Sequence, residues 1–204
     1  VLRQNPLRPE LVNGQLYLIA QINSNDSAKA LDKLVAKLPE LHRYIAIRAL
    51  GLNESEEATK ALQRMAKDRG DLRVRRQAIR VLASGDQEAL DFLHNKRLRY
   101  ESDLRVRALI LELLMNRGQP DLDKAFLTAA KSKDTVYAGV GLEGIGKQKI
   151  KAGLKSIHGA LDHQDVQYRL AAYEALASYG GERQYAAIIE GLQDSINMVV
   201  LPEI

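Results

Sequence analysis

The stretch Asp71-Leu72-Arg73-Val74-Arg75-Arg76-Gln77-Ala78-Ile79-Arg80-Val81-Leu82 decides the fold, because its pattern returns along the chain at a nearly constant spacing. Successive copies open 31 or 32 residues apart. The openings are Pro39, Asp71, Asp103, Asp134 and Asp165, with a weaker copy near Pro9. A period of this length predicts an array of similar structural units that bury one continuous core by stacking.

Three columns recur when the opening residue is counted as position zero. Position four holds Arg43, Arg75, Arg107 and Arg169, with Ala138 in the remaining unit. Position seven is mostly small, and position eleven is Leu or Ile. Positions four, seven and eleven lie on one stripe of a helix with 3.6 residues per turn. The pattern therefore predicts an amphipathic helix in each unit, with the opening Asp as its N-cap.

A second helical pattern follows the first in each unit, after turn residues such as Gly85-Asp86 and Gly180-Gly181. Residues 26–34 and 56–65 are two examples, and no stretch has the alternation of a sustained strand. We predict an all-α protein, an α-solenoid of about six helical hairpins in a single domain over residues 1–204. The expected repeats lie near 9–38, 39–70, 71–102, 103–133, 134–164 and 165–196.

The pattern Asp-x-x-Val-Arg-x-x-Ala-x-x-x-Leu, followed by Gly and a second helix, resembles the HEAT repeat. It is most similar to the short HEAT-like type named after phycobilisome lyases. Asp71, Val74, Arg75, Ala78 and Leu82 match every marked position. The resemblance implies a right-handed superhelix whose second helices line the concave face. It also implies a structural ladder of Asp and Arg between repeats, made here of Asp71, Arg75, Asp103, Arg107, Asp165 and Arg169.

Composition argues against most kinds of catalytic site. The chain has 204 residues, 46% of them hydrophobic, four His and neither Cys nor Trp. Thiolate chemistry is therefore excluded, and no His pair has the spacing of a helical metal site. We expect no catalytic residue, no metal and no cofactor.

The glycines of residues 139–144 spell G-x-G-x-x-G, which is a phosphate-binding pattern only when it follows a strand. The repeat register instead places these glycines inside a first helix, opposite Leu170, Ala172 and Ala175. We therefore expect close helix packing or a flexible joint, with nucleotide binding as the less favoured alternative.

The charges suggest one candidate binding surface. The net charge is only +4, but the middle of the chain is more basic than its flanks. Stacked second helices would align a basic strip that suits phosphates or an acidic protein surface; a solvated helix face is the alternative. The strip consists of Lys96, Arg97, Arg99, Lys124, Lys131, Lys147, Lys149, Lys151 and Lys155.

The leading functional hypothesis is a non-catalytic scaffold that binds a protein partner or a neighbouring domain of the same polypeptide. The alternative is a HEAT-like protein that binds nucleic acid through the basic strip, although the chain lacks the tryptophans of HEAT-like DNA glycosylases. A role in bilin attachment is suggested only by the name of the repeat type. We expect a soluble protein without membrane contact, from cytoplasm or periplasm, that is a piece or processed form of a longer chain.

Overall fold

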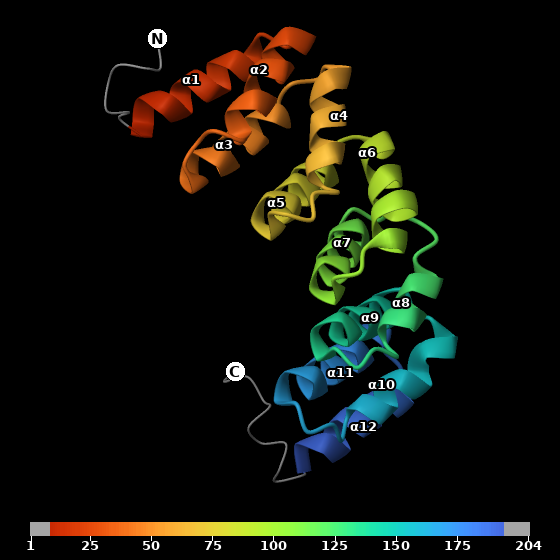
Figure 1. Ribbon diagram of the computed structural model, residues 1–204. Coiled ribbons are helices and arrows are strands. Elements are labelled where there is room, and N and C mark those ends of the chain that lie inside the picture. The colour runs from red at the N-terminus through yellow and green to blue at the C-terminus, as the bar shows by residue number, and fades with distance from the viewer. Residues whose placement is uncertain (1–8, 194–204) are drawn as a thin grey trace. The chain divides into compact units, whose positions relative to one another are not determined.

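The computed structural model describes residues 9–193, and all the regular structure in this range is helical (Figure 1). Twelve α-helices form six successive hairpins within it, which confirms the predicted all-α repeat architecture. The chain divides into two compact units, residues 1–100 and 101–204, and each is described by itself below. The expectation of one continuous domain over residues 1–204 stays a prediction.

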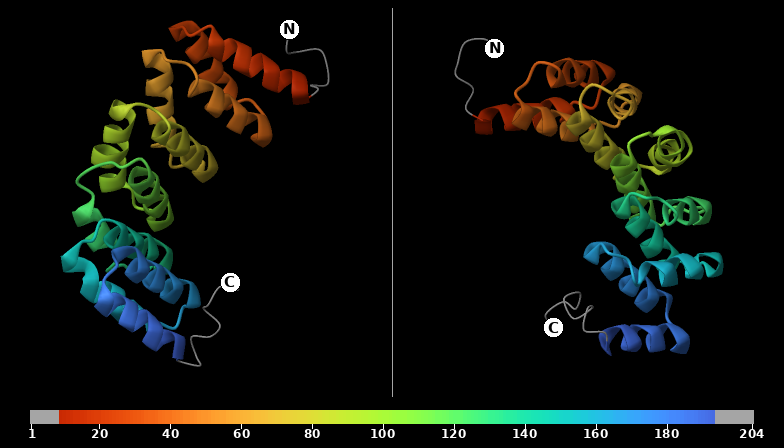
Figure 2. Two further views of the ribbon diagram at one scale, coloured as in Figure 1. Left: turned by 180° about the vertical axis from the view of Figure 1, so that it is seen from behind. Right: turned by 60° about the horizontal axis from the view of Figure 1, so that its bottom comes forward.

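Unit 1 consists of three hairpins arranged in two layers (Figures 1 and 2). Each first helix packs against the first helix of the next hairpin, and α2 packs against α4. The first helices are α1 (Pro9–Gln21), α3 (Glu40–Leu50) and α5 (Leu72–Ala83). The second helices are α2 (Asn25–Val35), α4 (Glu56–Met65) and α6 (Gln87–Phe92), the last continued by the π-helix η1 (Leu93–Leu98).

Unit 2 repeats this build with three further hairpins. Helix α9 packs against α7 and α11 on either side and also against α8. The first helices are α7 (Leu104–Asn116), α9 (Thr135–Lys147) and α11 (Val166–Tyr179). The second helices are α8 (Asp123–Ala129), α10 (Leu154–Ala160), preceded by the 3-10 turn η2 (Lys151–Gly153), and α12 (Glu182–Gln193).

The opening aspartates begin the first helices as the sequence predicts. Asp71, Asp103, Asp134 and Asp165 are the N-caps of α5, α7, α9 and α11, and each side chain accepts hydrogen bonds from first-turn amides. A carboxylate satisfies donors there that have no partner inside the helix and also meets the positive end of the helix dipole. The N-cap prediction is confirmed at these four positions.

A buried asparagine joins the first two hairpins of unit 1 at their inter-helix turns. Asn53 is buried, and its amide donates to the Ser27 Oγ over 2.8 Å while its carbonyl oxygen accepts from the Ser55 amide over 3.0 Å. Beside it, the Glu54 amide donates to the Asn23 Oδ1 over 2.7 Å. The Asn53 bonds satisfy an amide that would otherwise be buried without partners, and together with the Glu54–Asn23 bond they fix how the two hairpins stack.

The glycines of the G-x-G-x-x-G pattern lie inside helix α9 and serve close packing. A Cβ on Gly141 would lie 2.4 Å from the backbone nitrogen of Ala130, and one on Gly144 would overlap the ring of Phe126. The sequence placed these glycines opposite the following repeat. That is correct for Gly139, whose Cβ would lie 3.6 Å from the Ala171 Cβ, and for Gly146 just after the pattern, whose Cβ would lie 2.3 Å from the Ala175 carbonyl oxygen. Gly141 and Gly144 instead approach the preceding helix α8. A buried helix interior offers no phosphate cradle, so these glycines support packing and not nucleotide binding.

Replacing Gly141 with Ala will therefore destabilise unit 2, because the new methyl group meets backbone that cannot rotate away. We expect a loss of roughly 1–3 kcal/mol in the free energy of unfolding, measured by urea denaturation. Gly139→Ala is the matched control in the same helix. Its Cβ would meet only the Ala171 Cβ at 3.6 Å, so the gain in helix propensity should stabilise by up to about 1 kcal/mol. Equal effects of the two variants would contradict this account of the packing.

Candidate interaction face

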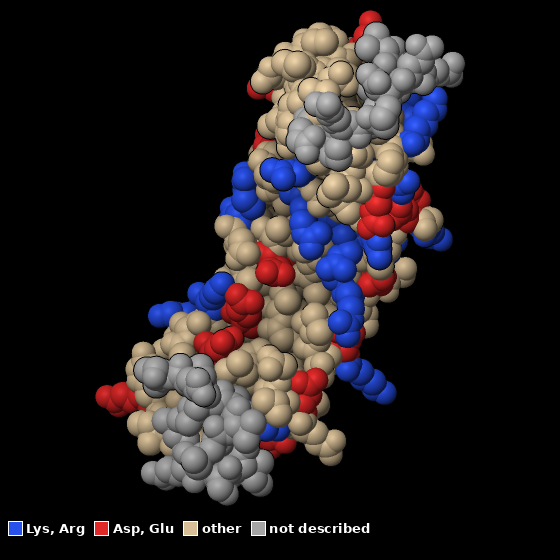
Figure 3. All heavy atoms as spheres, turned by 90° about the vertical axis from the view of Figure 1, so that its left-hand side faces the viewer, with Lys and Arg blue, Asp and Glu red and all other residues tan. Residues whose placement is uncertain are grey.

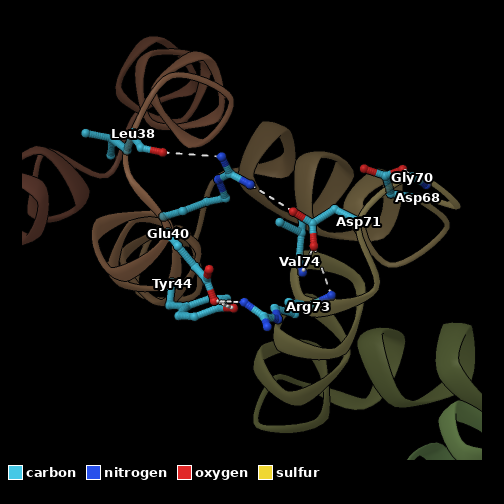
Figure 4. A network of polar contacts seen from close by, with 9 residues as sticks. Leu38, Glu40, Tyr44, Asp68, Gly70, Asp71, Arg73 and Val74 are labelled. Atoms are coloured by element: carbon cyan, nitrogen blue, oxygen red, sulfur yellow. Dashed lines mark hydrogen bonds and ion pairs between the residues drawn. The ribbon is translucent and has the colours of Figure 1, made fainter.

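A network of polar contacts joins the N-terminal ends of α3 and α5 (Figure 4). The Arg43 guanidinium on α3 lies 2.8 Å from Asp71 Oδ2 and donates to the Leu38 carbonyl oxygen over 3.3 Å. The other Asp71 oxygen accepts from the amides of Arg73 and Val74, over 2.9 and 3.1 Å. One carboxylate thus caps α5 and ties it to the preceding hairpin. The Val74 amide is the main cause that lowers the pKa of Asp71, against an opposing effect of burial.

A second ion pair reinforces the first on the solvent side. Arg73 of α5 contacts Glu40 of α3, and the Tyr44 hydroxyl donates to the same carboxylate over 2.9 Å. The Tyr44 hydrogen bond and the Arg73 guanidinium lower the pKa of Glu40, whereas partial desolvation and the Glu40 charge raise the pKa of Tyr44. One carboxylate oxygen of Glu40, Oε1, is therefore shared by two neighbours of its own unit.

Beyond this network, the first helices of unit 1 present one continuous outward surface, which we name the unit 1 face. It consists of positions two, nine and thirteen of each repeat, which share one side of a helix. On α1 and α3 these positions carry Leu, Ile and Arg. Five apolar side chains of the face are between 58% and 66% exposed. They are Leu11, Leu18, Ile22, Leu41 and Leu52.

Arginines adjoin the apolar side chains on the same face. Arg48 and Arg80 occupy position nine of α3 and α5 and are exposed, and Arg76 lies one turn before Arg80. None of these three side chains forms an ion pair or hydrogen bond with another residue that the structure describes. The space-filling view of the side on which α3 and α5 lie in Figure 1 shows Lys and Arg side chains gathered there (Figure 3). The face is thus apolar over α1, mixed over α3, where Arg48 stands between Leu41 and Leu52, and cationic over α5.

A cleft of about 480 Å³ lies elsewhere in unit 1, at the C-terminal ends of α2 and α4. Its apolar lining includes Val35, Met65 and Val74. Its charges are largely paired with each other, because Arg64 lies 2.7 Å from Asp32 and Arg43 is bound to Asp71. Lys67 and Asp68 complete the charged lining, and Lys67 lies 5.1 Å from the Phe92 ring centre.

The structure places the members of the predicted ladder unevenly. The pair Arg43–Asp71 has the predicted geometry, in which position four binds the cap of the next repeat. In unit 2, Asp134 instead lies 4.0 Å from Arg105, while the Arg107 guanidinium stacks 5.2 Å from the Tyr137 ring centre. The predicted contact of Arg107 with an acid is therefore corrected, because its guanidinium lies over the ring of Tyr137 instead.

The contacts of Asp165 and Arg169 also differ from the predicted pattern. Asp165 accepts a hydrogen bond from the Thr135 hydroxyl over 2.9 Å, since Ala138 occupies the Arg column. The Arg169 guanidinium turns back to the carbonyl oxygens of His163 and Gln164, which precede its own helix. The pairing of Arg75 with Asp103 stays a prediction.

The predicted basic strip needs one correction. Arg97 is only 8% exposed within η1, so it cannot belong to a solvated binding surface. Lys96 and Arg99 are exposed in unit 1, and Lys147 in unit 2 pairs with Glu143 over 2.6 Å. The remaining lysines of the strip are exposed in unit 2 and carry no ion pair with described residues: Lys124, Lys131, Lys149, Lys151 and Lys155. Their role in binding stays a prediction.

Residues 9–193 lack two other kinds of feature, a metal site and a membrane span. No three side chains among the His, Asp and Glu of this range come together in a way that would hold a metal ion. No helix in the same range is both long and apolar enough to cross a membrane.

The described helices form hairpins that stack in sequence, and an aspartate caps four of the first helices. This arrangement defines an all-α helical repeat protein. Residues 27–115 match the family model described as HEAT repeats, and this part of the chain belongs to the HEAT-repeat family. The described hairpins continue the same build to Gln193. A comparison with curated proteins finds no match to the chain. HEAT repeats commonly mediate protein interactions and are typically non-catalytic.

Removing the Asp71 carboxylate will destabilise unit 1, because the cap of α5 and the partner of Arg43 disappear together. Asp71→Ala should lower the free energy of unfolding by roughly 0.5–2 kcal/mol at pH 7. The pKa of Asp71 is lowered in the folded protein, so this stabilisation is complete above the unfolded value of about 4 and declines as pH falls through the folded pKa. Urea denaturation of the wild type and the variant between about pH 7 and pH 3 checks this.

Asp162→Ala is the control for this experiment, because Asp162 is exposed and its carboxylate caps no helix. It should change the free energy of unfolding by no more than about 0.5 kcal/mol. A gap between wild type and Asp71→Ala that stays constant down to about pH 3 would show that the carboxylate charge contributes nothing.

Proposed function

We propose that this chain is a non-catalytic HEAT-repeat scaffold, and that a protein partner or a neighbouring domain of the same polypeptide covers the unit 1 face. The observation that carries the proposal is the group of five exposed Leu and Ile side chains on α1 and α3. Solvated helix faces are normally polar, and contiguous exposed apolar side chains mark interaction surfaces.

The energetics favour an interaction role for these positions. Leaving a Leu or Ile in water forgoes roughly 1.5–3 kcal/mol that full burial of the side chain provides. Leu11, Leu18 and Ile22 contribute nothing to the core of unit 1, whose α1 side chains are Val12, Leu16 and Ala20. The exposed set is therefore dispensable for folding, and its cost in water is offset when a partner covers it.

The fold supports a binding role more than a catalytic one. The cleft of unit 1 is lined by charges that pair with each other, and the face is a broad surface on rigid helices. Rigid repeat arrays offer extended surfaces of this kind, on which several separated side chains contribute to one interaction. The same surface serves a partner separate from this polypeptide and a domain linked to it.

Serine at two positions of the face will abolish partner binding without unfolding the protein. We expect Leu18→Ser/Leu41→Ser to reduce the captured partner at least about tenfold, because the two substitutions remove one exposed apolar contact from each of the two helices. The tagged protein is exposed to extract of its native source, and quantitative mass spectrometry identifies proteins bound in stoichiometric amounts. Circular dichroism should show unchanged helix content.

The control Val136→Ser/Ile189→Ser removes two exposed apolar side chains of unit 2, off the unit 1 face. It should retain the partner. Equal retention by both double variants would exclude the unit 1 face as the binding surface. For a chain linked to a further domain, the same comparison is made by limited proteolysis of the full polypeptide, where the face variant should be cut faster.

Nucleic-acid binding remains the second candidate, because five exposed lysines of unit 2 carry no ion pair with described residues. Duplex DNA and single-stranded RNA should be titrated at about 50 mM salt, where phosphate contacts are strongest. Binding that is lost in Lys149→Glu/Lys151→Glu, but kept in Leu18→Ser/Leu41→Ser, would select this candidate over the scaffold.

A further inference from the structure

We propose that the unit 1 face takes one kind of partner segment: an amphipathic helix whose apolar stripe is bordered on one side by carboxylates. This proposal rests on the proposed scaffold function and names the chemistry of what the scaffold binds. It follows from three features of the face, namely its apolar half, its cationic edge and the geometry of the helices that carry them.

The apolar half is long and narrow. Leu11, Leu18 and Ile22 are spaced i, i+7 and i+11, so they follow one line along α1. The matching line of α3, which packs beside α1, holds Leu41, Arg48 and, just beyond the helix end, Leu52. The register is fixed by the contact of His42 Nδ1 with Asn13 Oδ1 at 3.2 Å, which joins neighbouring positions of the two helices. The two lines form a pair of parallel ridges, of which the first is apolar and the second has an arginine between two leucines.

Parallel ridges on adjacent helices accept a third helix in the groove between them. Neighbouring helix axes are about 8–10 Å apart, and α1 with 13 residues is about 20 Å long. A partner helix of three to four turns matches this length and meets both ridges with residues at i, i+3, i+4 and i+7. A β-strand would not fit as well, because the face presents helix side chains and no unpaired strand edge.

The cationic edge determines which charge a complementary partner segment carries. Arg48 stands in the α3 ridge and Arg76 and Arg80 follow on α5, and none of the three has an acidic partner among the described residues. Glu40, at the start of α3, is held by Arg73 and Tyr44. Guanidinium groups bind carboxylates with two parallel hydrogen bonds, so a partner with Glu or Asp along one flank complements this edge.

The combination favours an acidic helix over other occupants. Nucleic acid would meet the arginines but leave the Leu and Ile side chains of α1 in water. A purely apolar segment would cover the ridges and leave the arginines without partners, which forgoes their contribution and their specificity. Only a segment that is apolar on one side and acidic on the adjoining side satisfies both halves of the face.

The test uses three synthetic helical peptides of about fourteen residues, long enough to span α1. The first has a Leu stripe flanked by Glu, the second has the same stripe flanked by Lys, and the third has the first composition in scrambled order. Their binding to the whole chain is measured by fluorescence anisotropy at about 50 and about 300 mM salt. The Glu-flanked peptide should bind at least about tenfold more tightly than the other two, and salt should weaken it.

Protein variants separate the two halves of the face. Arg48→Glu/Arg80→Glu should lose the Glu-flanked peptide and gain the Lys-flanked one, because the sign of the edge is reversed. Leu18→Ser/Leu41→Ser should weaken both peptides. The control Arg69→Glu/Arg183→Glu makes the same change in net charge at exposed positions off the face, and it should behave as the wild type.

Two results would overturn the proposal: no binding of the Glu-flanked peptide, or equal binding of the Glu- and Lys-flanked peptides. The scaffold function itself fails differently, when Leu18→Ser/Leu41→Ser retains the partner captured from extract. A captured partner that is lost in that variant but insensitive to Arg48→Glu/Arg80→Glu would leave the scaffold standing and refute the acidic helix.

Discussion

The fold depends on one packing constraint: neither helix of a hairpin can bury its apolar stripe alone, so each must approach a neighbouring hairpin closely. Position seven makes that approach possible, because Ala46, Ala78 and Ala172 are fully buried there and Gly141 takes the place of a methyl group. Position eleven then fills the space with Leu or Ile in the five repeats that follow the first. Interiors packed at crystal density tolerate little change in volume, so these two columns must vary together.

The polar contacts act on this packing by setting its register. Asp71 serves two hairpins at once, since one oxygen accepts from the first turn of α5 and the other binds Arg43 of α3. Asn53 does the corresponding work at the opposite end of the helices, where the inter-helix turns meet. Apolar contacts are not directional, and these bonds are. They define which turn of one helix lies beside which turn of the next.

The sequence predicts the helices, their caps and the buried columns because each of these follows from local periodicity. The sequence predicts the side-chain contacts between successive repeats less well. The pattern does not show that Arg107 stacks on Tyr137, because the Asp134 carboxylate and the Tyr137 ring both lie at the start of the next first helix. The direction in which Gly141 packs also needed the structure, because a glycine signals close approach without naming the neighbour.

Part of the unit 1 face follows from the sequence pattern. Leu11, Leu18 and Ile22 stand in the outward columns of the same register that predicts the core, but the first repeat is the weakest copy and its register was the least secure. The sequence pattern does not predict the burial of Arg97. The basic strip assumes an α-helix there, whereas residues 93–98 form the π-helix η1. Local winding decides such side-chain directions, and composition does not record it.

The separation of columns in this repeat has a consequence for how such a protein changes over time. The residues that hold the hairpins together and those at positions nine and thirteen, which meet solvent, alternate along the same helix. Substitutions in positions nine and thirteen can accumulate while the interior columns are kept. A new binding preference can thus arise within one hairpin without a change in the architecture that supports it.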